Sequence, residues 1–400
     1  MLVFIICFFT VSFSLCQNSS DFKALKKELF FTKEYDKDSK PVKDYKSTIY
    51  VNVELTLNSL ITLDEVQQRL TTIGYLHISW HDEFLTWDRK QYGDLDYIYL
   101  PQSSIWKPDI TLQDSYTEME ELGSDLILAT IKHDGSVNWT PFQVFNSYCP
   151  VSMTFFPFDR QTCEFVFGAW SMQMNDISLL ITNVSGIALE RSIKENTIWT
   201  IVSTSVKATQ YHEESRVIFS ITLQRKPLYV MMHLVLPLVL LTLLNLFTFA
   251  IPADSGERMG YTVTVWLSFG VFLTLVGQSL PESSESISFM DIFIVMQLFQ
   301  STLVVLLSAV LSRLIARNGQ TFISSCLLKR IVTYKRGKSV STSSEIKKDE
   351  KETQIYITWK EYVSTIDFCV FWCLLSICIL LITALSFYTV YKAEYTLSGE

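Results

Sequence analysis

Histidine is scarce in this chain: five residues among 400, with no metal-ligand spacing between any two of them. Because zinc sites in proteins are built mainly from clustered His and Cys ligands, the histidines are more in keeping with structural roles, and we predict no metal site and no cofactor. No recognisable set of nucleophile, base and orienting acid occurs, which argues against an enzyme. A basic stripe is also missing, so nothing indicates nucleic-acid binding, and the net charge of −8 decides nothing on that point.

Cysteines are few, and their positions restrict how they can pair. Two of the eight, Cys7 and Cys16, fall in the first apolar stretch. Cys149 and Cys163 are then the only pair available to a folded N-terminal region, and we predict that one disulfide closes the loop between them. Unpaired thiols or a metal site are the alternatives. The other four cysteines lie late in the chain, at Cys326, Cys369, Cys373 and Cys378.

The first residues have the form of a secretory signal peptide, although they contain no Lys or Arg. Residues 1–16 are apolar and precede a polar stretch, so we expect the mature chain to begin near Gln17. The glycosylation sequons at Asn18, Asn138 and Asn183 fit export. Chance is the alternative explanation for these short motifs. For Asn138, which precedes Trp139, a structural role is a further alternative.

Long apolar runs dominate only the second half of the chain. Residues 228–251, 259–280, 289–311 and 368–388 each approach or exceed the ~20 apolar residues that cross a bilayer. We therefore predict four membrane helices.

Charge predicts the orientation of these helices. Ten Lys and Arg lie between Arg313 and Lys351, and the connection 281–286 has none, so the positive-inside rule places the third-to-fourth connection in the cytoplasm. Both termini are then extracellular, and we expect the protein in the plasma membrane. The predicted divisions are a signal peptide (1–16), an extracellular domain (17–227), helices one to three (228–312), a cytoplasmic connection (313–367), the fourth helix (368–391) and a tail (392–400).

The region before the first membrane helix reads as β-structure. Six segments show apolar/polar alternation or aromatic and β-branched residues between turn signals. This spacing fits an antiparallel β-sandwich, so the predicted fold is an extracellular β-sandwich followed by a four-helix transmembrane domain. The six segments are 49–57, 70–80, 125–132, 142–153, 163–170 and 217–224.

The second membrane segment contains polar residues that lipid would not favour. On helical spacing, a single stripe could line water, with Leu267 and Val271 as a constriction that closes by dewetting. The alternative is that its hydroxyls only hold helices together. The stripe consists of Glu257, Gly260, Thr264, Leu267, Val271, Thr274 or Leu275, and Gln278.

Two carboxylates at the start of this segment favour a cation pore. Asp254 and Glu257 could form a ring around a symmetric axis, which would attract cations and repel anions. Arg258 follows Glu257 directly, but one residue along a helix turns it by about 100°, away from the axis.

Several ordered motifs together resemble one family. They are Trp80-His81-Asp82, Trp106-Lys107-Pro108-Asp109, Gly135-Ser136-Val137-Asn138-Trp139, Phe156-Pro157-Phe158-Asp159 inside the cysteine loop, Phe167-Gly168-Ala169-Trp170, and Arg225 ahead of Pro227-Leu228-Tyr229. In these motifs the chain resembles a Cys-loop receptor subunit, a pentameric ligand-gated ion channel of the nicotinic acetylcholine receptor type.

The resemblance implies an agonist pocket between subunits, lined by aromatic rings that bind a small cationic amine. It places Trp170 on the principal face and Tyr75 on the complementary face, with Tyr211 as the capping aromatic. The chain departs from the family at Gln113, where the family usually has Tyr, and in having no adjacent Cys pair between residues 199 and 225. Core packing is the alternative for any aromatic residue, and we expect it for Trp80, Trp87, Trp106 and Trp139.

The resemblance also implies residues that couple the pocket to the pore. It pairs Arg225 with Glu65 as a buried ion pair, alongside the 280–286 linker. The alternatives are a snorkelling Arg225 and a solvated Glu65. The remaining coupling residues are Phe156, Pro157, Phe158 and Asp159.

The expected partners follow from the same resemblance: like subunits in a homo- or hetero-pentamer, a small extracellular ligand, permeant monovalent cations and membrane lipid. A postsynaptic location is one option. A second hypothesis is a partner or assembly subunit that binds no agonist itself, which Gln113 and the missing Cys pair favour.

Overall fold

The computed structural model describes residues 19–182, 185–194, 196–278, 288–316, 320–322 and 356–398. The described chain forms two compact units. The β unit comprises Met1–Val151 and Gln161–Gln224, and the helical unit comprises Ser152–Arg160 and Arg225–Glu400. Several predictions fall wholly or largely outside the described residues: the signal peptide, the sequons at Asn18 and Asn183, the 280–286 linker and most of the cytoplasmic connection.

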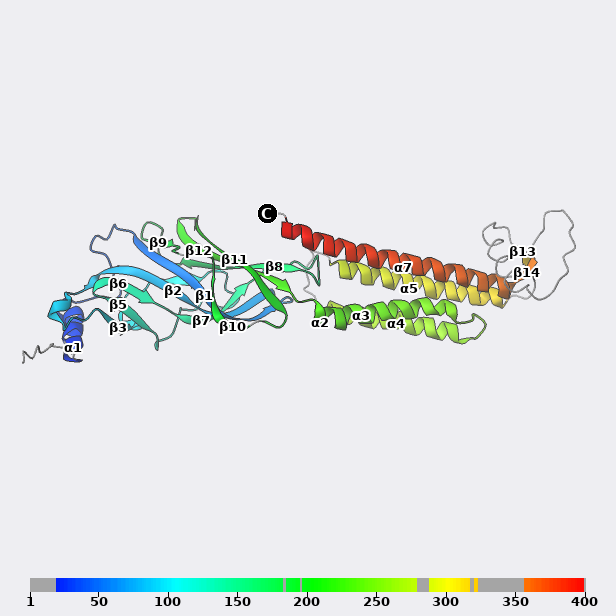
Figure 1. Ribbon diagram of the computed structural model, residues 1–400, viewed down its shortest axis with the longest axis horizontal. Coiled ribbons are helices and arrows are strands. Elements are labelled where there is room, and N and C mark those ends of the chain that lie inside the picture. The colour runs from blue at the N-terminus through cyan, green and yellow to red at the C-terminus, as the bar shows by residue number, and fades with distance from the viewer. Residues whose placement is uncertain are drawn as a thin grey trace, which may run out of the picture. The chain divides into compact units, whose positions relative to one another are not determined.

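The β unit is built from two sheets, which Figure 1 draws in blue to green. In the described residues, the larger sheet has the order β10-β1-β2-β6-β5-β3, with β7 also paired to β2 and β9 to β1, and the smaller has the order β11-β12-β8-β4. The larger sheet contains β1 (Ile49–Asp64), β2 (Arg69–Thr86), β3 (Tyr97–Pro101), β5 (Leu128–Lys132), β6 (Asp134–Trp139), β7 (Phe142–Tyr148), β9 (Ile177–Leu180) and β10 (Ala188–Lys194). The smaller sheet contains β4 (Ile110–Leu112), β8 (Arg160–Ala169), β11 (Trp199–Tyr211) and β12 (Glu214–Arg225).

The two sheets pack face to face through the side chains that alternate residues direct inward. Along β12 every second residue is buried and the others are half-exposed, as the period of two in a strand requires. Phe145 of the larger sheet meets Phe165 and Phe167 of the smaller one, with ring centroids 6.4 and 5.6 Å apart. The predicted sandwich is confirmed, and its main pairings are antiparallel, although β9 and β10 pair with β1 in parallel.

The predicted core tryptophans are buried as expected. Trp80, Trp87, Trp106 and Trp139 are all less than a tenth exposed. The rings of Trp80 and Trp106 meet edge to face at 5.8 Å, and the Trp139 indole N–H donates to the Gln102 side-chain oxygen at 2.8 Å. These contacts show why large aromatics with one polar atom suit this core.

All six predicted strand segments overlap observed strands, but other elements were missed. β11 has no long alternating pattern, because most of its side chains on both faces are exposed or half-exposed. An N-terminal helix, α1 (Ser19–Lys27), continues into a π-helical turn (Glu28–Thr32) and buries Leu25 and Leu29 four residues apart. Its acidic first turn and basic last turn complement the helix dipole.

The predicted disulfide is present. Cys149 and Cys163 are fully buried and bonded, with Cα atoms 5.0 Å apart. The bond closes the loop that contains the Phe156–Pro157 bond, which is cis. This covalent link fixes the ends of a segment whose middle belongs to the helical unit.

The helical unit contains four described helices long and apolar enough to cross a membrane: Leu228–Ala250, Glu257–Gly277, Met290–Ile315 and Trp359–Ala384. The first combines α2 (Leu228–Val230), a π-helical turn (Met231–Val235), α3 (Leu236–Phe247) and a 3₁₀ turn (Thr248–Ala250). The π turn ends just before Pro237, which cannot donate a backbone hydrogen bond and so disturbs the regular helix there. The others are α4 (Glu257–Gly277), α5 (Phe289–Ile315) and α7 (Trp359–Ser398).

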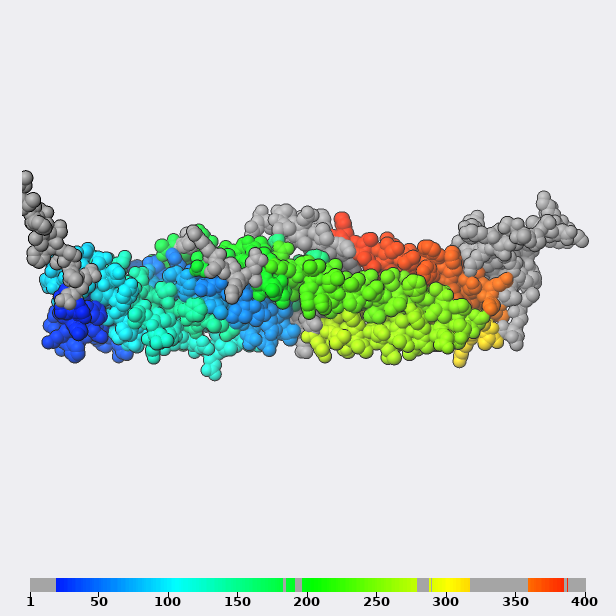
Figure 2. All heavy atoms as spheres, turned by 60° about the horizontal axis from the view of Figure 1, so that its bottom comes forward, coloured from blue at the N-terminus to red at the C-terminus, as the bar shows by residue number. Residues whose placement is uncertain are grey.

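These helices pack through a small apolar core that includes the end of α5 and the start of α7. Phe249, Val304, Leu311 and Val363 are buried together there. Figure 2 shows side chains filling the surface along the green α3, yellow-green α4 and orange-red α7. α7 begins at Trp359, nine residues before the predicted membrane span at residue 368, and agrees with a helix that runs from the polar connection into that span. A short pair of strands, β13 (Gln320–Phe322) and β14 (Tyr356–Thr358), brings the ends of α5 and α7 together.

Candidate functional site

The outer face of the smaller sheet carries a cluster of aromatic and charged residues. Four of its members are Tyr211, Glu214, Arg216 and Trp170, from β11, β12 and the end of β8. Glu214 and Arg216 alternate with the buried Ser215 and Val217, so both project away from the sandwich core. Gln113, which follows β4, completes the cluster, because its side-chain amide donates to Glu214 Oε2 at 3.4 Å.

The backbone at Trp170 is held by hydrogen bonds, and the indole ring is exposed. Its backbone N–H donates to the Asp109 carbonyl at 3.3 Å, and the next N–H, of Ser171, donates to Asp109 Oδ2 at 2.5 Å. The side chain is 58% exposed, an unusual position for a tryptophan. Among the described residues its ring has no aromatic or cationic partner, so the Trp170 face is available to a ligand or to another subunit.

The Gln113 side chain packs against Gly168 of β8, where no larger residue would leave room for it. A Cβ at Gly168 would overlap Gln113 Nε2 and would sit 3.3 Å from Arg216 Cγ. Gln113 Oε1 is itself buried without a hydrogen-bond partner in the described structure. Residue 113 is therefore packed between two strands of the sheet, and the amide replaces an aromatic ring at the place where the family pattern predicts one.

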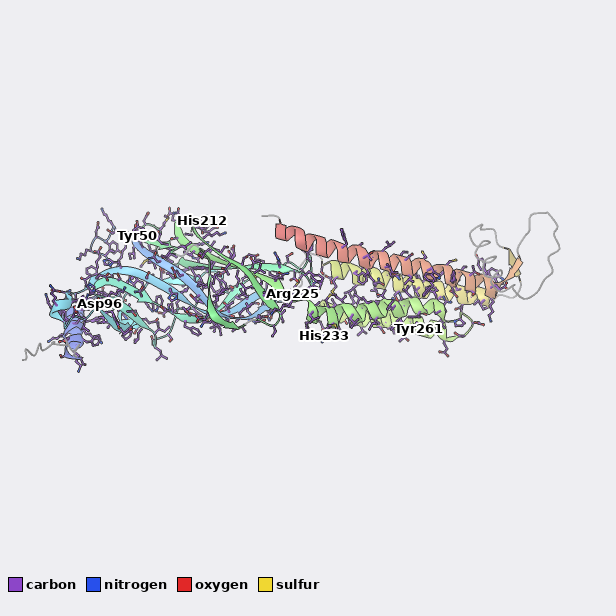
Figure 3. The ribbon with its side chains drawn as sticks, in the orientation of Figure 1. Tyr50, Asp96, His212, Arg225, His233 and Tyr261 are labelled. Carbon is purple, nitrogen blue, oxygen red and sulfur yellow. A yellow bond between two sulfur atoms is a disulfide. The ribbon has the colours of Figure 1, made fainter. Side chains whose placement is uncertain are left out.

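A tight hairpin carries Tyr211. β11 and β12 are joined by only two residues, His212 and Glu213, whose φ angles of 47° and 68° are both left-handed. Such a two-residue turn matches the twist of a hairpin, and non-glycine residues adopt it at some cost. The Met174 N–H donates to the Glu213 carbonyl at 2.7 Å, which fastens the turn. Figure 3 labels His212 at this end of the hairpin.

Arg216 connects the charged and aromatic members of the cluster. Its guanidinium carbon lies 4.3 Å from the centroid of the Tyr211 ring. Its Nη2 and Nε donate to Glu214 Oε2 at 2.8 and 3.2 Å. This hydrogen bond lowers the pKa of the Glu214 carboxyl.

Tyr75 lies on the other sheet. It points outward from β2, where the even-numbered neighbours are buried, and its hydroxyl donates to Glu190 Oε2 of β10 at 3.2 Å. Partial burial and this hydrogen bond raise the pKa of the phenol. Because Tyr75 and Trp170 project from opposite sheets of one sandwich, a pocket that contains both needs two copies of the fold.

Arg225, at the end of β12, makes a buried ion pair. Its Nε and Nη2 donate to Asp159 Oδ1 and Oδ2 at 2.7 and 3.1 Å, and its guanidinium lies 5.0 Å from the Phe156 ring. Both charged residues are less than a tenth exposed. Asp159 is a partner of Arg225 within the helical unit. The predicted Arg225–Glu65 contact stays a prediction, because Glu65 belongs to the other unit.

The predicted water-lining stripe lies along the uncovered face of α4. Leu267 and Val271 are 54% and 62% exposed, and the Thr264 hydroxyl donates to the Gly260 carbonyl at 2.8 Å. The opposite face of the helix is buried by the other helices, through Arg258, Thr262, Val265, Phe269 and Val276. All the stripe residues are exposed: Glu257, Gly260, Thr264, Leu267, Val271, Thr274, Leu275 and Gln278.

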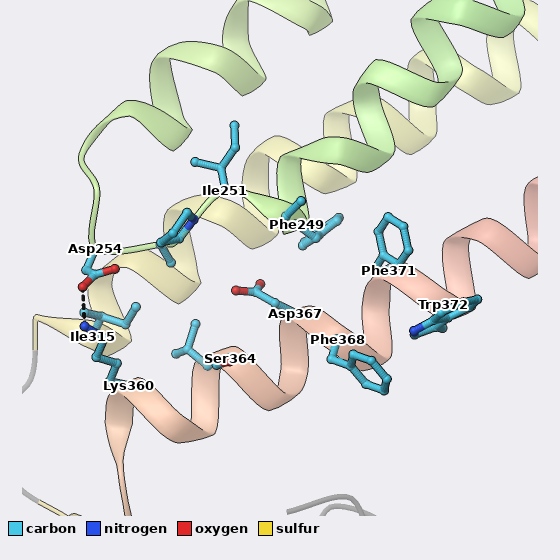
Figure 4. A pocket seen from close by; sticks show the side chains of 14 residues that line it. Phe249, Ile251, Asp254, Ile315, Lys360, Ser364, Asp367, Phe368, Phe371 and Trp372 are labelled. Atoms are coloured by element: carbon cyan, nitrogen blue, oxygen red, sulfur yellow. Dashed lines mark hydrogen bonds and ion pairs between the residues drawn. The ribbon is translucent and has the colours of Figure 1, made fainter. Parts of the chain in front are cut away.

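The charged residues around the start of α4 make different contacts. Arg258 turns inward and forms a bidentate pair with Asp367 of α7, at 2.9 and 2.8 Å, and is 1% exposed. Asp254 lies on the preceding turn and accepts from Lys360 Nζ at 2.6 Å, which lowers its pKa. Figure 4 shows both carboxylates around a cavity of about 450 Å³. Glu257 is exposed on the stripe and has no ion-pair partner in the described residues, so it is the free carboxylate at this end of α4.

Residues 23–227 match the neurotransmitter-gated ion-channel ligand binding domain, and residues 234–340 match the neurotransmitter-gated ion-channel transmembrane region. The chain belongs to the neurotransmitter-gated ion-channel family. Its relatives include the delta subunit of the Xenopus laevis acetylcholine receptor, 28% identical over 345 residues, which are 80% of this chain and 65% of that subunit.

Two further relatives of this channel subunit come from invertebrates. A beta-type acetylcholine receptor subunit of Caenorhabditis elegans, unc-29, is 29% identical over 356 residues, which are 87% of this chain and 71% of that subunit. The acetylcholine receptor subunit beta-like 1 of Drosophila melanogaster is 31% identical over 311 residues, 75% of this chain and 58% of that subunit. The chain thus covers only 65% of the Xenopus subunit's length, 71% of the Caenorhabditis elegans subunit's and 58% of the Drosophila subunit's.

Family membership confirms the predicted resemblance and the two-part fold with four membrane spans. The family consists of ligand-gated ion channels and not of enzymes. In the described residues of this subunit, no group of three or more His, Cys, Asp and Glu is placed to hold a metal ion. The sequon residue Asn138 has an exposed side chain on β6.

Sequence reasoning missed four charged residues of these sites. For Glu214 and Arg216 a signal existed, because the apolar alternation that begins at Val217 places both on the outer face of β12. For Lys360 and Asp367 it did not, since they lie 106 and 109 residues from their partners.

Proposed function

We propose that the chain is a subunit of a pentameric ligand-gated cation channel, which opens a membrane pore when a small extracellular ligand binds between subunits. The observation that carries the proposal is the uncovered stripe of α4. It bears hydroxyl and apolar groups along its length and the free carboxylate of Glu257 at one end, and Arg258 is withdrawn to the opposite face. Five such stripes around one axis would line a water-filled pore with a negatively charged entrance.

In this arrangement the subunit lies in the plasma membrane. The N-terminal domain and the C-terminus are extracellular, and the basic connection after α5 is cytoplasmic. The positive-inside rule and the exported disulfide domain support this orientation. Leu267 and Val271 would form the closed constriction, because two rings of exposed apolar side chains expel water from a narrow pore. Arg225, Asp159 and Phe156 would transmit the binding event, since a buried ion pair at the end of β12 can hold one of two arrangements.

The experiment is a reversal-potential measurement under voltage clamp. Replacing external Na⁺ by a large organic cation should shift the reversal potential to more negative values, and replacing chloride should leave it unchanged. Glu257→Gln should reduce the cation-to-chloride permeability ratio. Asp125→Asn removes an exposed carboxylate of the β unit and should leave that ratio unchanged. A wild-type current that follows chloride would overturn the proposal.

A second candidate function is a partner subunit that assembles and conducts but offers no complete agonist face. Gln113 in place of an aromatic residue, the absence of an adjacent Cys pair, and the engaged Tyr211 ring favour it. Expression of the chain alone separates the two candidates: ligand-evoked current from homomeric channels favours the first, and pentamers that respond only when a second subunit is present favour the second.

A further inference from the structure

The outer face of the smaller sheet offers two features that attract a cation. A ring face with a carboxylate beside it is the usual protein environment for a bound ammonium group. Here the ring is Tyr211, which is 53% exposed, and the carboxylate is Glu214, whose side chain is 31% exposed. Both lie on the face that also presents Trp170, the residue expected to meet a ligand.

A cation of the chain itself already occupies these two features. The Arg216 guanidinium lies 4.3 Å from the Tyr211 centroid, closer than the 5.4 Å between Arg69 and Tyr116 or between Lys107 and Trp139. The same guanidinium donates twice to Glu214 Oε2. The ring and the carboxylate therefore hold one cation between them.

The neighbouring residues hold Arg216 in this place. Its aliphatic stem lies over Gly168, where even a Cβ would come within 3.3 Å of Cγ. Gln113 donates to the same Glu214 oxygen, and the hairpin turn is fastened through Met174. The arginine side chain is only 23% exposed, so it is not a loose surface group.

We infer that Arg216 is a resident cation that fills the ammonium position of the principal face, so that this face does not accept a cationic amine. The inference deepens the proposed function and rests on it. Where the chain borders another subunit, it would contribute to an amine site through its complementary face, on which Tyr75 and the Glu190 carboxylate lie together. A second positive charge beside Arg216 would be repelled, and neither the ring nor the carboxylate would be free to compensate it.

The test measures binding of acetylcholine, used as a quaternary ammonium probe, to the purified full-length pentamer by isothermal titration calorimetry. Arg216→Gln frees the ring and the carboxylate, and it should tighten binding about tenfold, the change produced by the recovery of ~1.4 kcal/mol of attraction. Arg216→Lys keeps a cation and should not tighten binding. Lys207→Gln removes a positive charge from the exposed part of the same hairpin and serves as the matched control. Size-exclusion chromatography shows that each variant remains a pentamer.

Equal affinities of wild type and Arg216→Gln overturn the inference, as does a wild-type affinity that falls when Tyr211 is changed to Ala. A gain with Arg216→Gln that Lys207→Gln reproduces also overturns it, because the effect is then one of overall charge. The proposed function is tested separately, by the cation current of the Leu267→Ser variant, in which a polar constriction should leave the pore open. Tighter binding without any such current sustains the role of Arg216 and rejects the channel proposal.

Discussion

The buried pair between Arg258 and Asp367 yields the most demanding prediction for the helical unit. It joins the first turn of α4 to α7 by two hydrogen bonds of 2.8 and 2.9 Å, and the Asp367 side chain is only 11% exposed. Removing one partner of a buried pair leaves the other charge without compensation. We therefore expect Asp367→Asn to lower the free energy of unfolding by about 3–5 kcal/mol.

The matched control is the neighbouring exposed pair. Asp254 and Lys360 bridge the same two segments at 2.6 Å, but their side chains are 39% and 72% exposed. Surface pairs of this kind are screened by solvent and contribute little, so Asp254→Asn should hardly change stability. Each variant removes one carboxylate charge, from the buried, bidentate Arg258 pair in one case and from the exposed, single Lys360 contact in the other.

The assay is thermal unfolding of the detergent-solubilised full chain, followed by loss of the pentamer peak in fluorescence-detected chromatography. Asp367→Asn should lower the midpoint well below that of Asp254→Asn. The double variant Arg258→Met with Asp367→Leu should recover most of the loss, because apolar residues of similar size can replace a buried pair at little cost. Equal midpoints for Asp367→Asn and Asp254→Asn would refute the reasoning.

Three further predictions concern the β unit. Burial raises the pKa of Asp114 to about 6 from 3.8, so the folded chain binds this proton more tightly than the unfolded chain. Stability should therefore fall by about 2.5 kcal/mol as pH rises from 4 to 7, and Asp114→Asn should remove that slope in pH-dependent unfolding. Replacing Cys149 and Cys163 together by Ser should cost about 3 kcal/mol in denaturant unfolding, because the open loop gains entropy in the unfolded chain; an unchanged midpoint would contradict this. Gly168→Ala should displace Gln113, whose Nε2 the added Cβ would overlap, and weaken its hydrogen bond to Glu214, visible as a lower midpoint of thermal unfolding.

Local patterns in the sequence predicted much of this molecule. Apolar alternation located six of the strands, and apolar run length located four membrane helices. Helical spacing also placed the α4 stripe, from Glu257 to Gln278, on one face and Arg258 on another, as the exposures of these residues show. These predictions succeeded because each depends on a period of a single element.

Contacts between distant segments could not be predicted in this way. Arg258 pairs with a residue 109 positions away, and Asp254 is engaged by Lys360 from the same distant helix. The Arg225–Asp159 pair likewise joins residues 66 positions apart. Side-chain pairing across strands depends on register and hairpin geometry, which a single sequence does not specify.

The central claim is that five copies of α4 surround a shared aqueous axis. It is tested most directly by cysteine accessibility in conducting channels, with Thr264 and Leu267 each replaced by Cys and the buried Phe269 as the control position. A water-soluble, cationic thiol reagent should block the current through Thr264→Cys and Leu267→Cys and leave Phe269→Cys unaffected. Protection of the thiols introduced by Thr264→Cys and Leu267→Cys in both the resting and the activated state would contradict the account.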